Sequence, residues 1–195
     1  MSHELRTPMN AVLGFTQILK VDPENNLNPA QQEQLDHILT AGNHLLELIS
    51  EVLDLAKVES GTMTLNLEPA NVFTLIEEMK EILQPIAEEY DIRLSIVLDS
   101  SLSMTAWADK LRLRQILYNL VSNAIKYNRK GGSVTVACKP LNRESIQVDV
   151  IDTGLGISAE DQIKLFEPFV RLGKEHSDVD GTGIGLTVTK ELIEL

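Results

Sequence analysis

Residues with the chemistry of a metal and phosphate site follow one another in the stretch NLVSNAIKY. Asn119, Asn123, Lys126 and Tyr127 stand at i, i+4, i+7 and i+8, which places them along one side of a helix. Two amide oxygens, an ammonium group and an aromatic ring in a row suit a magnesium ion, phosphates and a base, in that order. A stripe of polar residues that simply faces solvent is the alternative, and this motif alone leaves it open.

The stretch DTGLGI, residues 152–157, combines a carboxylate with two glycines. Gly154 and Gly156 allow the backbone to pass close to a flat ligand. The carboxylate of Asp152 can accept a hydrogen bond from the exocyclic amine of adenine, which would select adenine over guanine. A hairpin turn would use the same residues, so the motif is weak by itself.

A second glycine-rich stretch, GTGIGL at residues 181–186, opens a predicted helix. Glycines before a helix N-terminus expose backbone amides that can bind phosphate. The stretch differs from a dinucleotide-binding GxGxxG, because no strand precedes it and no βαβ unit surrounds it. The preceding residues 166–180 have little periodicity and suit a mobile lid over a nucleotide. Phe166 and Phe169 within them are equally compatible with anchoring core residues.

The first residues, SHELRTPMN, contain a candidate nucleophile. His3 falls on the solvent side of a predicted helix, with Glu4 beside it and Thr7 one turn further on. A neutral imidazole, with a pKa near ~6.5, is a usable nucleophile at neutral pH. Pro8 removes the backbone hydrogen bond to the Glu4 carbonyl, so we expect the helix to bend there. A solvated polar first turn is the alternative interpretation.

Two helices joined by a turn-rich loop at residues 21–29 are predicted for the first sixty residues. Their apolar seams follow heptad spacing and comprise Leu5, Met9, Val12, Thr16 and Leu19, then Leu35, Ile38, Gly42, Leu45, Ile49, Val52 and Ala56. Asn28 and Gln31 form a capping box before the second helix, and Gly61 follows its end. Because one hairpin cannot bury both seams, we expect two copies to form a four-helix bundle.

The period changes after the segment ESGT, residues 59–62, which we expect to separate the two parts. Strands are predicted at residues 63–69, 92–99, 105–109, 133–140 and 145–152, the last two as a hairpin. Helices are predicted after the N-caps Asn71, Asp109 and Ser158, and from near Gly183. The expected buried positions are Val72, Leu75, Ile76, Met79, Ile82, Leu83 and Ile86 in one helix, and Leu113, Ile116, Leu117, Leu120, Val121 and Ala124 in the next. The predicted class is α+β: a helical hairpin, then an α/β sandwich with a mixed sheet covered by helices on one face.

Composition limits the function classes. The chain is 43% hydrophobic but 4% aromatic, so its core must be aliphatic. The net charge of −12 argues against nucleic acid or an anionic membrane as a partner. No apolar run approaches the ~20 residues of a membrane span. The single cysteine, Cys138, is most simply a buried core residue.

The motifs SHELRTP, NxxxNAxKY, DTGLGI, FEPF and GTGIGL occur in this order along the chain. Together they resemble the catalytic core of a bacterial sensor histidine kinase. The resemblance implies a dimerization and phosphoacceptor domain at residues 1–60 and a GHKL-type ATP-binding domain at residues 62–195. It also implies that His3 accepts the γ-phosphoryl group of ATP and that Glu4 is its base or orienting partner.

The same resemblance assigns the nucleotide site. Asn123, helped by Asn119, would hold Mg²⁺, and Asp152 would accept from the adenine amine. The remaining implied contacts with ATP are Lys126, Tyr127, Gly154, Gly156, Ile157, Arg171, Gly181, Thr182, Gly183, Gly185 and Leu186.

The implied partners are a second copy of the chain and the receiver domain of a response regulator. In the family, a residue at the position of Thr7 can orient a water that dephosphorylates the regulator. A cytoplasmic location is expected, for a parent that can itself be membrane-anchored. Relatives begin the first helix earlier and continue into two more strands, so we expect a fragment that is truncated at its N-terminus and lacks the last strands.

Two other functions remain as alternatives, a clamp ATPase of the gyrase or chaperone kind and a non-catalytic dimeric scaffold. The clamp ATPases place a water-activating glutamate four residues before the metal-binding asparagine. That position here is Asn119, which cannot act as a base, so transfer to a side chain is favoured over hydrolysis. The scaffold is disfavoured because the motif residues are all present.

Overall fold

The computed structural model describes residues 2–22, 25–98, 104–142, 145–171 and 181–195, except the side chains of Ser2, His3 and Leu98. The chain forms two compact units, Met1–Thr62 and Met63–Leu195. Across the described ranges, no helix combines the length and the apolar character that a membrane span requires.

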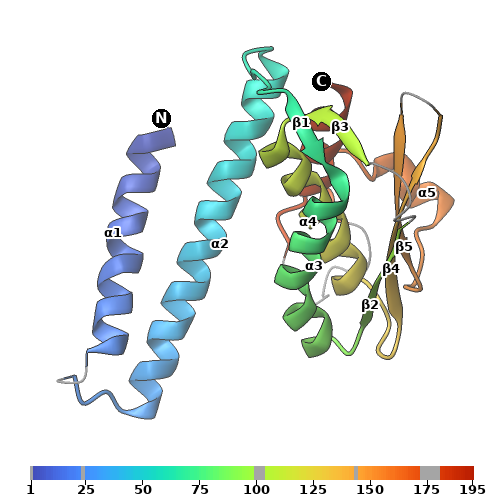
Figure 1. Ribbon diagram of the computed structural model, residues 1–195. Helices are drawn as coiled ribbons and strands as arrows, with labels where there is room; N and C mark the ends of the chain where they lie inside the picture. Colours follow the sequence, from blue (N-terminus) through green and yellow to red (C-terminus); the bar gives the residue numbers. More distant parts are fainter. Residues whose placement is uncertain (1, 23–24, 99–103, 143–144, 172–180) are drawn as a thin grey trace. The chain divides into compact units, whose positions relative to one another are not determined.

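The first unit is a hairpin of helices α1 (Ser2–Val21) and α2 (Pro29–Glu59) (Figure 1). α1 continues through Pro8 as one helix. The two helices pack closely at Gly42, where an added Cβ would lie 2.6 Å from Cδ2 of Leu13. Leu13 is 7% exposed although it lies outside the predicted seam. The absence of a side chain at Gly42 therefore sets how closely α1 can approach α2.

Both ends of α2 are formed as the sequence predicts. The Asn28 side chain accepts from the Gln31 amide at 2.9 Å, and the Gln31 side chain accepts from the Asn28 amide at 2.9 Å. At the other end Gly61 has φ +63°, and the Thr62 amide donates to the Lys57 carbonyl at 3.0 Å. This is the glycine-terminated C-cap in which the last carbonyls find partners.

The predicted seam is only partly buried by the hairpin itself. Thr16 and Gly42 are buried. Between 42 and 50% of the surface stays exposed on six aliphatic seam residues, Leu5, Val12, Leu19, Ile38, Leu45 and Val52. The hairpin therefore leaves a row of apolar side chains uncovered in a single chain.

The second unit is built from two sheets and four helices among its described residues. Its strands are β1 (Glu68–Asn71), β2 (Arg93–Leu98), β3 (Thr105–Ala108), β4 (Ser133–Pro140) and β5 (Ile146–Asp152). Its helices are α3 (Val72–Glu89), α4 (Lys110–Lys126), α5 (Ala159–Lys164) and α6 (Gly185–Glu194). β2 pairs in parallel with β4, and β4 pairs antiparallel with β5. α3 and α4 lie side by side on one face of this mixed sheet (Figure 1), which confirms the predicted fold class.

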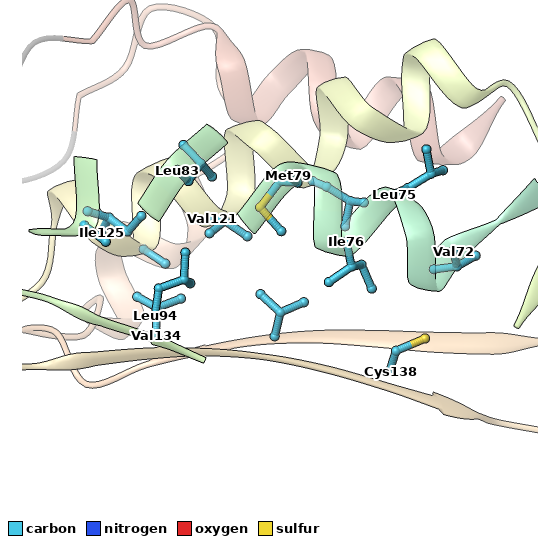
Figure 2. Close-up of a cluster of buried hydrophobic side chains, with 14 of the residues drawn as sticks. Val72, Leu75, Ile76, Met79, Leu83, Leu94, Val121, Ile125, Val134 and Cys138 are labelled. Atoms are coloured by element: carbon cyan, nitrogen blue, oxygen red, sulfur yellow. The ribbon is translucent and has the colours of Figure 1, made fainter. Parts of the chain in front are cut away.

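The core lies between these two helices and the sheet (Figure 2). The fully buried large side chains of this core cluster are all aliphatic: Ile76, Leu83, Val121, Ile125, Val134 and Val136. Cys138 extends the same cluster, with its Sγ 3.6 Å from Sδ of Met104. Burial raises the pKa of this thiol, so it is held as a neutral core residue, as expected from the sequence.

The N-terminus of α4 is held by Asp109. One carboxylate oxygen accepts from the amides of Leu111 and Arg112 at 3.0 and 3.1 Å. The other accepts from the amide of Asn66 at 3.0 Å. The Asn66 amide contributes most to lowering the pKa of this carboxyl below its usual value. A single side chain thus caps α4 and ties the segment before β1 to it.

Two strand predictions were wrong in detail. Residues 63–67 are not in a strand, and β1 begins at Glu68. Alternation was misleading there because the stretch is bonded through Asn66 to the α4 cap and not to a neighbouring strand. β1 and β3 form an antiparallel two-stranded sheet of their own, with Glu68 opposite Ala108 and Asn71 opposite Thr105. The predicted mixed sheet is thus the three-stranded sheet of β2, β4 and β5, and β1 and β3 pair apart from it.

Two burial predictions also need correction. Ile82 is 61% exposed, because it precedes Leu83, the buried residue of that turn, by one position and so points about 100° away. Ile125 is 0% exposed but was not among the predicted core residues of α4.

Neighbouring positions on α3 give a matched test of this core. Leu83→Ala should lower the free energy of unfolding of the second unit by about 2–5 kcal/mol, because it leaves a cavity among well-packed side chains. Ile82→Ala should change it by less than about 1 kcal/mol, because that side chain stays largely in water. Urea denaturation followed by circular dichroism measures both. Equal losses in the two variants would contradict the assignment of the buried face.

Candidate functional site

The polar stripe of α4 makes contact with α6. Asn119 Nδ2 donates to Oγ1 of Thr189 at 2.7 Å, and Asn123 Nδ2 donates to Oδ1 of Asn119 at 3.2 Å. Asn119 thus joins the two helices, which are 70 residues apart in sequence. Asn123 Oδ1 has no hydrogen bond among the described residues, so it is the amide oxygen of this pair that can accept from, or ligate, a bound group.

The Asp152 turn is held against the end of the same helix. Asp152 Oδ1 accepts from the Gly154 amide at 2.7 Å. A Cβ on Gly154 would lie 2.7 Å from the carbonyl oxygen of Tyr127, the C-cap of α4. The turn can therefore approach the helix only because residue 154 is glycine. The carboxylate of Asp152 is exposed, and its Oδ2 points to no partner among the described residues.

The second glycine stretch also contacts α4. A Cβ on Gly185, the first residue of α6, would lie 2.6 Å from Oδ1 of Asn119. A Cβ on Gly181 would lie 3.6 Å from the hydroxyl oxygen of Tyr127. Both ends of the stretch thus lie along the side of α4 that carries the polar stripe.

In the middle of this stretch, Gly183 has a positive φ and is hydrogen-bonded to Phe169, a second residue with positive φ. Gly183 has φ +72° and Phe169 has φ +65°. The Phe169 amide donates to the Gly183 carbonyl at 2.9 Å, and the Ile184 amide donates to Oγ1 of Thr182 at 3.2 Å. An unusual conformation for a bulky residue such as Phe169 is maintained by its surroundings and is common near functional sites.

The phenylalanine segment is attached to α6 through Phe166. Thr187 Oγ1 donates to the Phe166 carbonyl at 3.0 Å, and Lys190 Nζ lies 5.5 Å from the centre of the Phe166 ring. Phe169 is 64% exposed, which makes it no core residue. The lid predicted for residues 166–180 lies mostly outside the described residues, because those begin again at Gly181.

The other predicted site residues lie elsewhere in the second unit or, for His3, Glu4 and Thr7, in the first unit. Gly156 has φ +73°, and Ile157 is 44% exposed. Lys126 and Leu186 are half-buried, and Arg171 is exposed. His3 belongs to α1, and its side chain is outside the described part of the structure. Glu4 and Thr7 are exposed in the same helix.

Metal binding at this site would depend on amide and phosphate oxygens. In the described part of the chain, no group of three or more His, Cys, Asp or Glu side chains is arranged to hold a metal ion. Asn123 Oδ1 is a hard oxygen ligand of the kind Mg²⁺ accepts, and Mg²⁺ in nucleotide sites is completed by phosphates and water. The donor set therefore fits a magnesium ion that arrives with a nucleotide.

Sequence reasoning missed Thr189 and Thr187, the two α6 hydroxyls that join this helix to α4 and to the Phe166 segment. Both are buried, at 4 and 7% exposure. Their spacing in TVTK alternates instead of following the helix period, so it carried no signal for a helical contact. Their position four and two residues after the last glycine of the motif was the available clue.

Comparison with known proteins assigns this arrangement to a family. The family model of the His Kinase A (phospho-acceptor) domain matches residues 1–61. The family model of the histidine kinase-, DNA gyrase B- and HSP90-like ATPase matches residues 108–195. Together, the fold and these two matches define a histidine kinase core.

Individual relatives agree with that class. The chain is 39% identical over its whole length to the sensor protein GacS of Pseudomonas syringae pv. syringae, and 33% identical to the autoinducer 2 sensor kinase/phosphatase LuxQ of Vibrio cholerae. It spans 22 and 23% of the lengths of these two relatives. Full-length ShkA, solved in complex with AMPPNP, is similar with a TM-score of 0.81 and 32% identity over 98% of this chain and 39% of that one. The chain belongs to the sensor histidine kinase family.

The close contacts of the glycines predict opposite outcomes at two positions of one motif. Gly185→Ala should lower the melting temperature of the second unit by several degrees, because the new methyl group meets Asn119 Oδ1 at 2.6 Å and forces a shift of the side chain that donates to Thr189. Gly181→Ala should leave the melting temperature within about 1 °C, because its Cβ meets nothing closer than 3.6 Å. Differential scanning calorimetry compares them. A larger loss for Gly181→Ala would show that α6 does not pack on α4 as described.

Proposed function

We propose that this chain catalyses the ATP-dependent phosphorylation of its own His3 and passes the phosphoryl group to an aspartate in the receiver domain of a response regulator. Residues 1–60 would be the dimerization and phosphoacceptor domain, and residues 62–195 the ATP-binding domain. The observation that carries the proposal is the convergence of three sequence-distant motifs on one face of α4, through Gly154 at Tyr127 and through Gly185 at Asn119. Backbone approaches of this kind form a surface that a nucleotide can occupy.

Base recognition is assigned to Asp152. Its Oδ1 is used by the Gly154 amide, so Oδ2 is the atom that would accept a hydrogen bond from the adenine amine. Guanine presents a carbonyl at the equivalent position, and two acceptors would then face each other. The site should therefore prefer adenine nucleotides.

Phosphate handling is assigned to the other end of the stripe. Asn123 Oδ1 would ligate Mg²⁺, which when bound neutralises charge on the phosphates. The ammonium group of Lys126 and the guanidinium group of Arg171 would bind phosphate oxygens. The amides of the glycine stretch before α6 supply further donors at a helix N-terminus. The pairing of ShkA with AMPPNP, an ATP analogue, supports a nucleotide at the corresponding place.

Phosphoryl transfer itself needs positioning and charge neutralisation more than covalent chemistry from the protein. A ring nitrogen of His3 would attack the γ-phosphorus as the bond to the β–γ bridging oxygen breaks, and ADP would leave. The proton on the other ring nitrogen would be held or taken by Glu4. The aspartate of the regulator would then take the phosphoryl group and restore neutral His3.

Dimer formation is proposed through the hairpin. The six seam residues that remain 42–50% exposed lie on both helices, and a second hairpin could cover them in a four-helix bundle. Because ATP is a cytoplasmic substrate, we also propose a cytoplasmic location for residues 1–195.

A second activity, dephosphorylation of the regulator, is favoured by one comparison. LuxQ is described as both kinase and phosphatase, and Thr7 stands one turn after His3 on α1. A hydroxyl is too weak a base to activate water, so Thr7 would position the water by a hydrogen bond.

The nucleophile can be tested against a matched histidine in the same hairpin. His3→Gln should abolish the labelling of the chain by γ-³²P-ATP and leave its affinity for ADP nearly unchanged. His37→Gln should keep the labelling, because His37 is 79% exposed on α2 and contacts only Glu33 among the ion pairs described. The label should survive alkali and be lost in acid, as phosphohistidine is. Persistent labelling of His3→Gln would refute the assignment.

The adenine contact can be tested on two carboxylates of β5. Asp152→Asn should weaken MgADP binding by roughly 10- to 100-fold, because the amide can present a donor to the adenine amine and a charge-assisted hydrogen bond is lost. Asp149→Asn should bind normally, because Asp149 is paired with Lys139 at 3.2 Å and Gln147 at 2.6 Å. Isothermal titration calorimetry gives both dissociation constants. Wild-type affinity in Asp152→Asn would show that the base lies elsewhere.

A further inference from the structure

A polar cluster behind the Asp152 turn joins the end of α4 to the start of β4 and the end of β5. Its centre is Asn128. Asn128 Nδ2 donates to the carbonyls of Ala124 and Ser133, both at 3.1 Å. Asn128 Oδ1 accepts from the Arg129 amide at 2.9 Å and from Thr153 Oγ1 at 3.2 Å. Both donor hydrogens and both acceptor sites of this carboxamide are therefore used.

The second member of the cluster is Thr153. Its Oγ1 accepts from the Ser133 amide at 2.9 Å, and its own amide donates to the Ser133 carbonyl at 3.1 Å. A Cβ on Gly132 would lie 2.3 Å from Asn128 Oδ1 and 2.8 Å from Thr153 Oγ1. The cluster is thus closed on this side by a backbone that leaves no room for a side chain, so Asn128 and Thr153 have little freedom to shift.

The position of the cluster in the chain links it to base recognition. Asn128 directly follows Tyr127, whose carbonyl lies against Gly154. Thr153 stands between Asp152 and Gly154 in the Asp152 turn. The hydrogen bond between Asn128 and Thr153 therefore connects the helix that carries the phosphate-binding stripe with the turn that carries the adenine-binding carboxylate.

The backbone of Asp152 is held at the end of β5, opposite Val134 of β4, but among the described hydrogen bonds its carboxylate has a partner in its own turn alone. This carboxylate is exposed, and it accepts a hydrogen bond from the amide of Gly154, two residues further along the same turn. A hydrogen bond weakens steeply when the acceptor leaves the donor direction. Discrimination between the amine of adenine and the carbonyl of guanine therefore requires that the turn after β5 be fixed relative to α4. Among the described residues, the hydrogen bond between the side chains of Asn128 and Thr153 makes this connection.

We propose that Asn128 and Thr153 are positioning residues that set the adenine specificity of the site by fixing the Asp152 carboxylate relative to α4. This inference rests on the proposed nucleotide-binding function and adds two specificity-determining residues to it. Neither residue is expected to touch the nucleotide.

The test uses variants of one hydroxyl and a matched control. Thr153→Val removes the hydroxyl at nearly constant volume, and Thr153→Ser retains it. Thr135→Val removes a half-buried hydroxyl on β4 that bonds only to Ser95 Oγ, at 3.0 Å, among the contacts described. Calorimetric titration of the whole chain with MgADP and with MgGDP gives the affinity ratio for each variant, and thermal unfolding gives the loss of stability.

Thr153→Val should weaken MgADP binding by roughly 5- to 20-fold, the equivalent of one lost hydrogen bond or slightly more. It should affect MgGDP less, so that the preference for adenine falls at least about threefold. Thr153→Ser should keep the wild-type ratio within about twofold. Thr135→Val should lose a similar amount of stability and keep the wild-type ratio, because stability alone does not move specificity.

A second route keeps the test informative if Thr153→Val does not fold. Asn128→Ala should lower the ADP-to-GDP preference in the same direction. In the double variant the two effects on this preference should not add, because both changes remove the same Asn128–Thr153 hydrogen bond. An unchanged ratio in Thr153→Val, or in Asn128→Ala, with the stability loss of the control would overturn the inference and leave a purely structural cluster. A wild-type chain that binds neither nucleotide would instead overturn the proposed function.

Discussion

The second unit depends on how closely backbone can approach α4. Gly154 lies against the Tyr127 carbonyl, and Gly185 lies against the side-chain amide of Asn119, each so close that a Cβ would force a neighbouring group to shift. Any larger residue would push the turn or the helix N-terminus away by more than a hydrogen bond can tolerate. The same two contacts bring together segments separated by tens of residues, and the proposed nucleotide site exists where they meet.

α4 can serve as this platform because both of its faces are occupied. Its apolar side, with Leu117, Val121 and Ile125, is packed on α3 and the sheet. Its polar side bonds to α6 through Asn119 and Thr189. The helix is also held at its N-terminus by Asp109. A helix fixed along its length in this way presents side chains with little positional freedom, which is what recognition of a small ligand requires.

The hairpin of α1 and α2 differs from the second unit, because it has an apolar surface that its own residues leave exposed. Leu13 against Gly42 is the tight contact between α1 and α2, while six seam residues keep nearly half of their surface exposed. A second hairpin in a four-helix bundle would cover these exposed seam residues. The proposed dimer therefore follows from unburied area, just as the proposed nucleotide site follows from close backbone contact.

Local signals in the sequence determined a large part of this protein. The caps Asn28, Asp109 and Ser158, the glycine after α2 and the apolar stripes on α3 and α4 depend on residues within a few positions of one another. For that reason, the helices, the β4–β5 hairpin and the motif residues could be predicted. Resemblance to a known family, carried by the order of five motifs, added the expected roles.

Tertiary structure decided what depends on distant partners. Residues 63–67 alternate like a strand, but the Asp109 carboxylate, 43 positions from Asn66, takes their hydrogen bond. Ile82, expected in the core, is exposed, and Ile125, for which no burial was predicted, is fully buried, because the elements packed on each helix select which side of a wide apolar stripe is covered. Thr189 and Asn128 acquired partners 70 and 25 residues away. A local sequence pattern cannot indicate such contacts, because their partners are brought together only by the packing of the helices on the sheet.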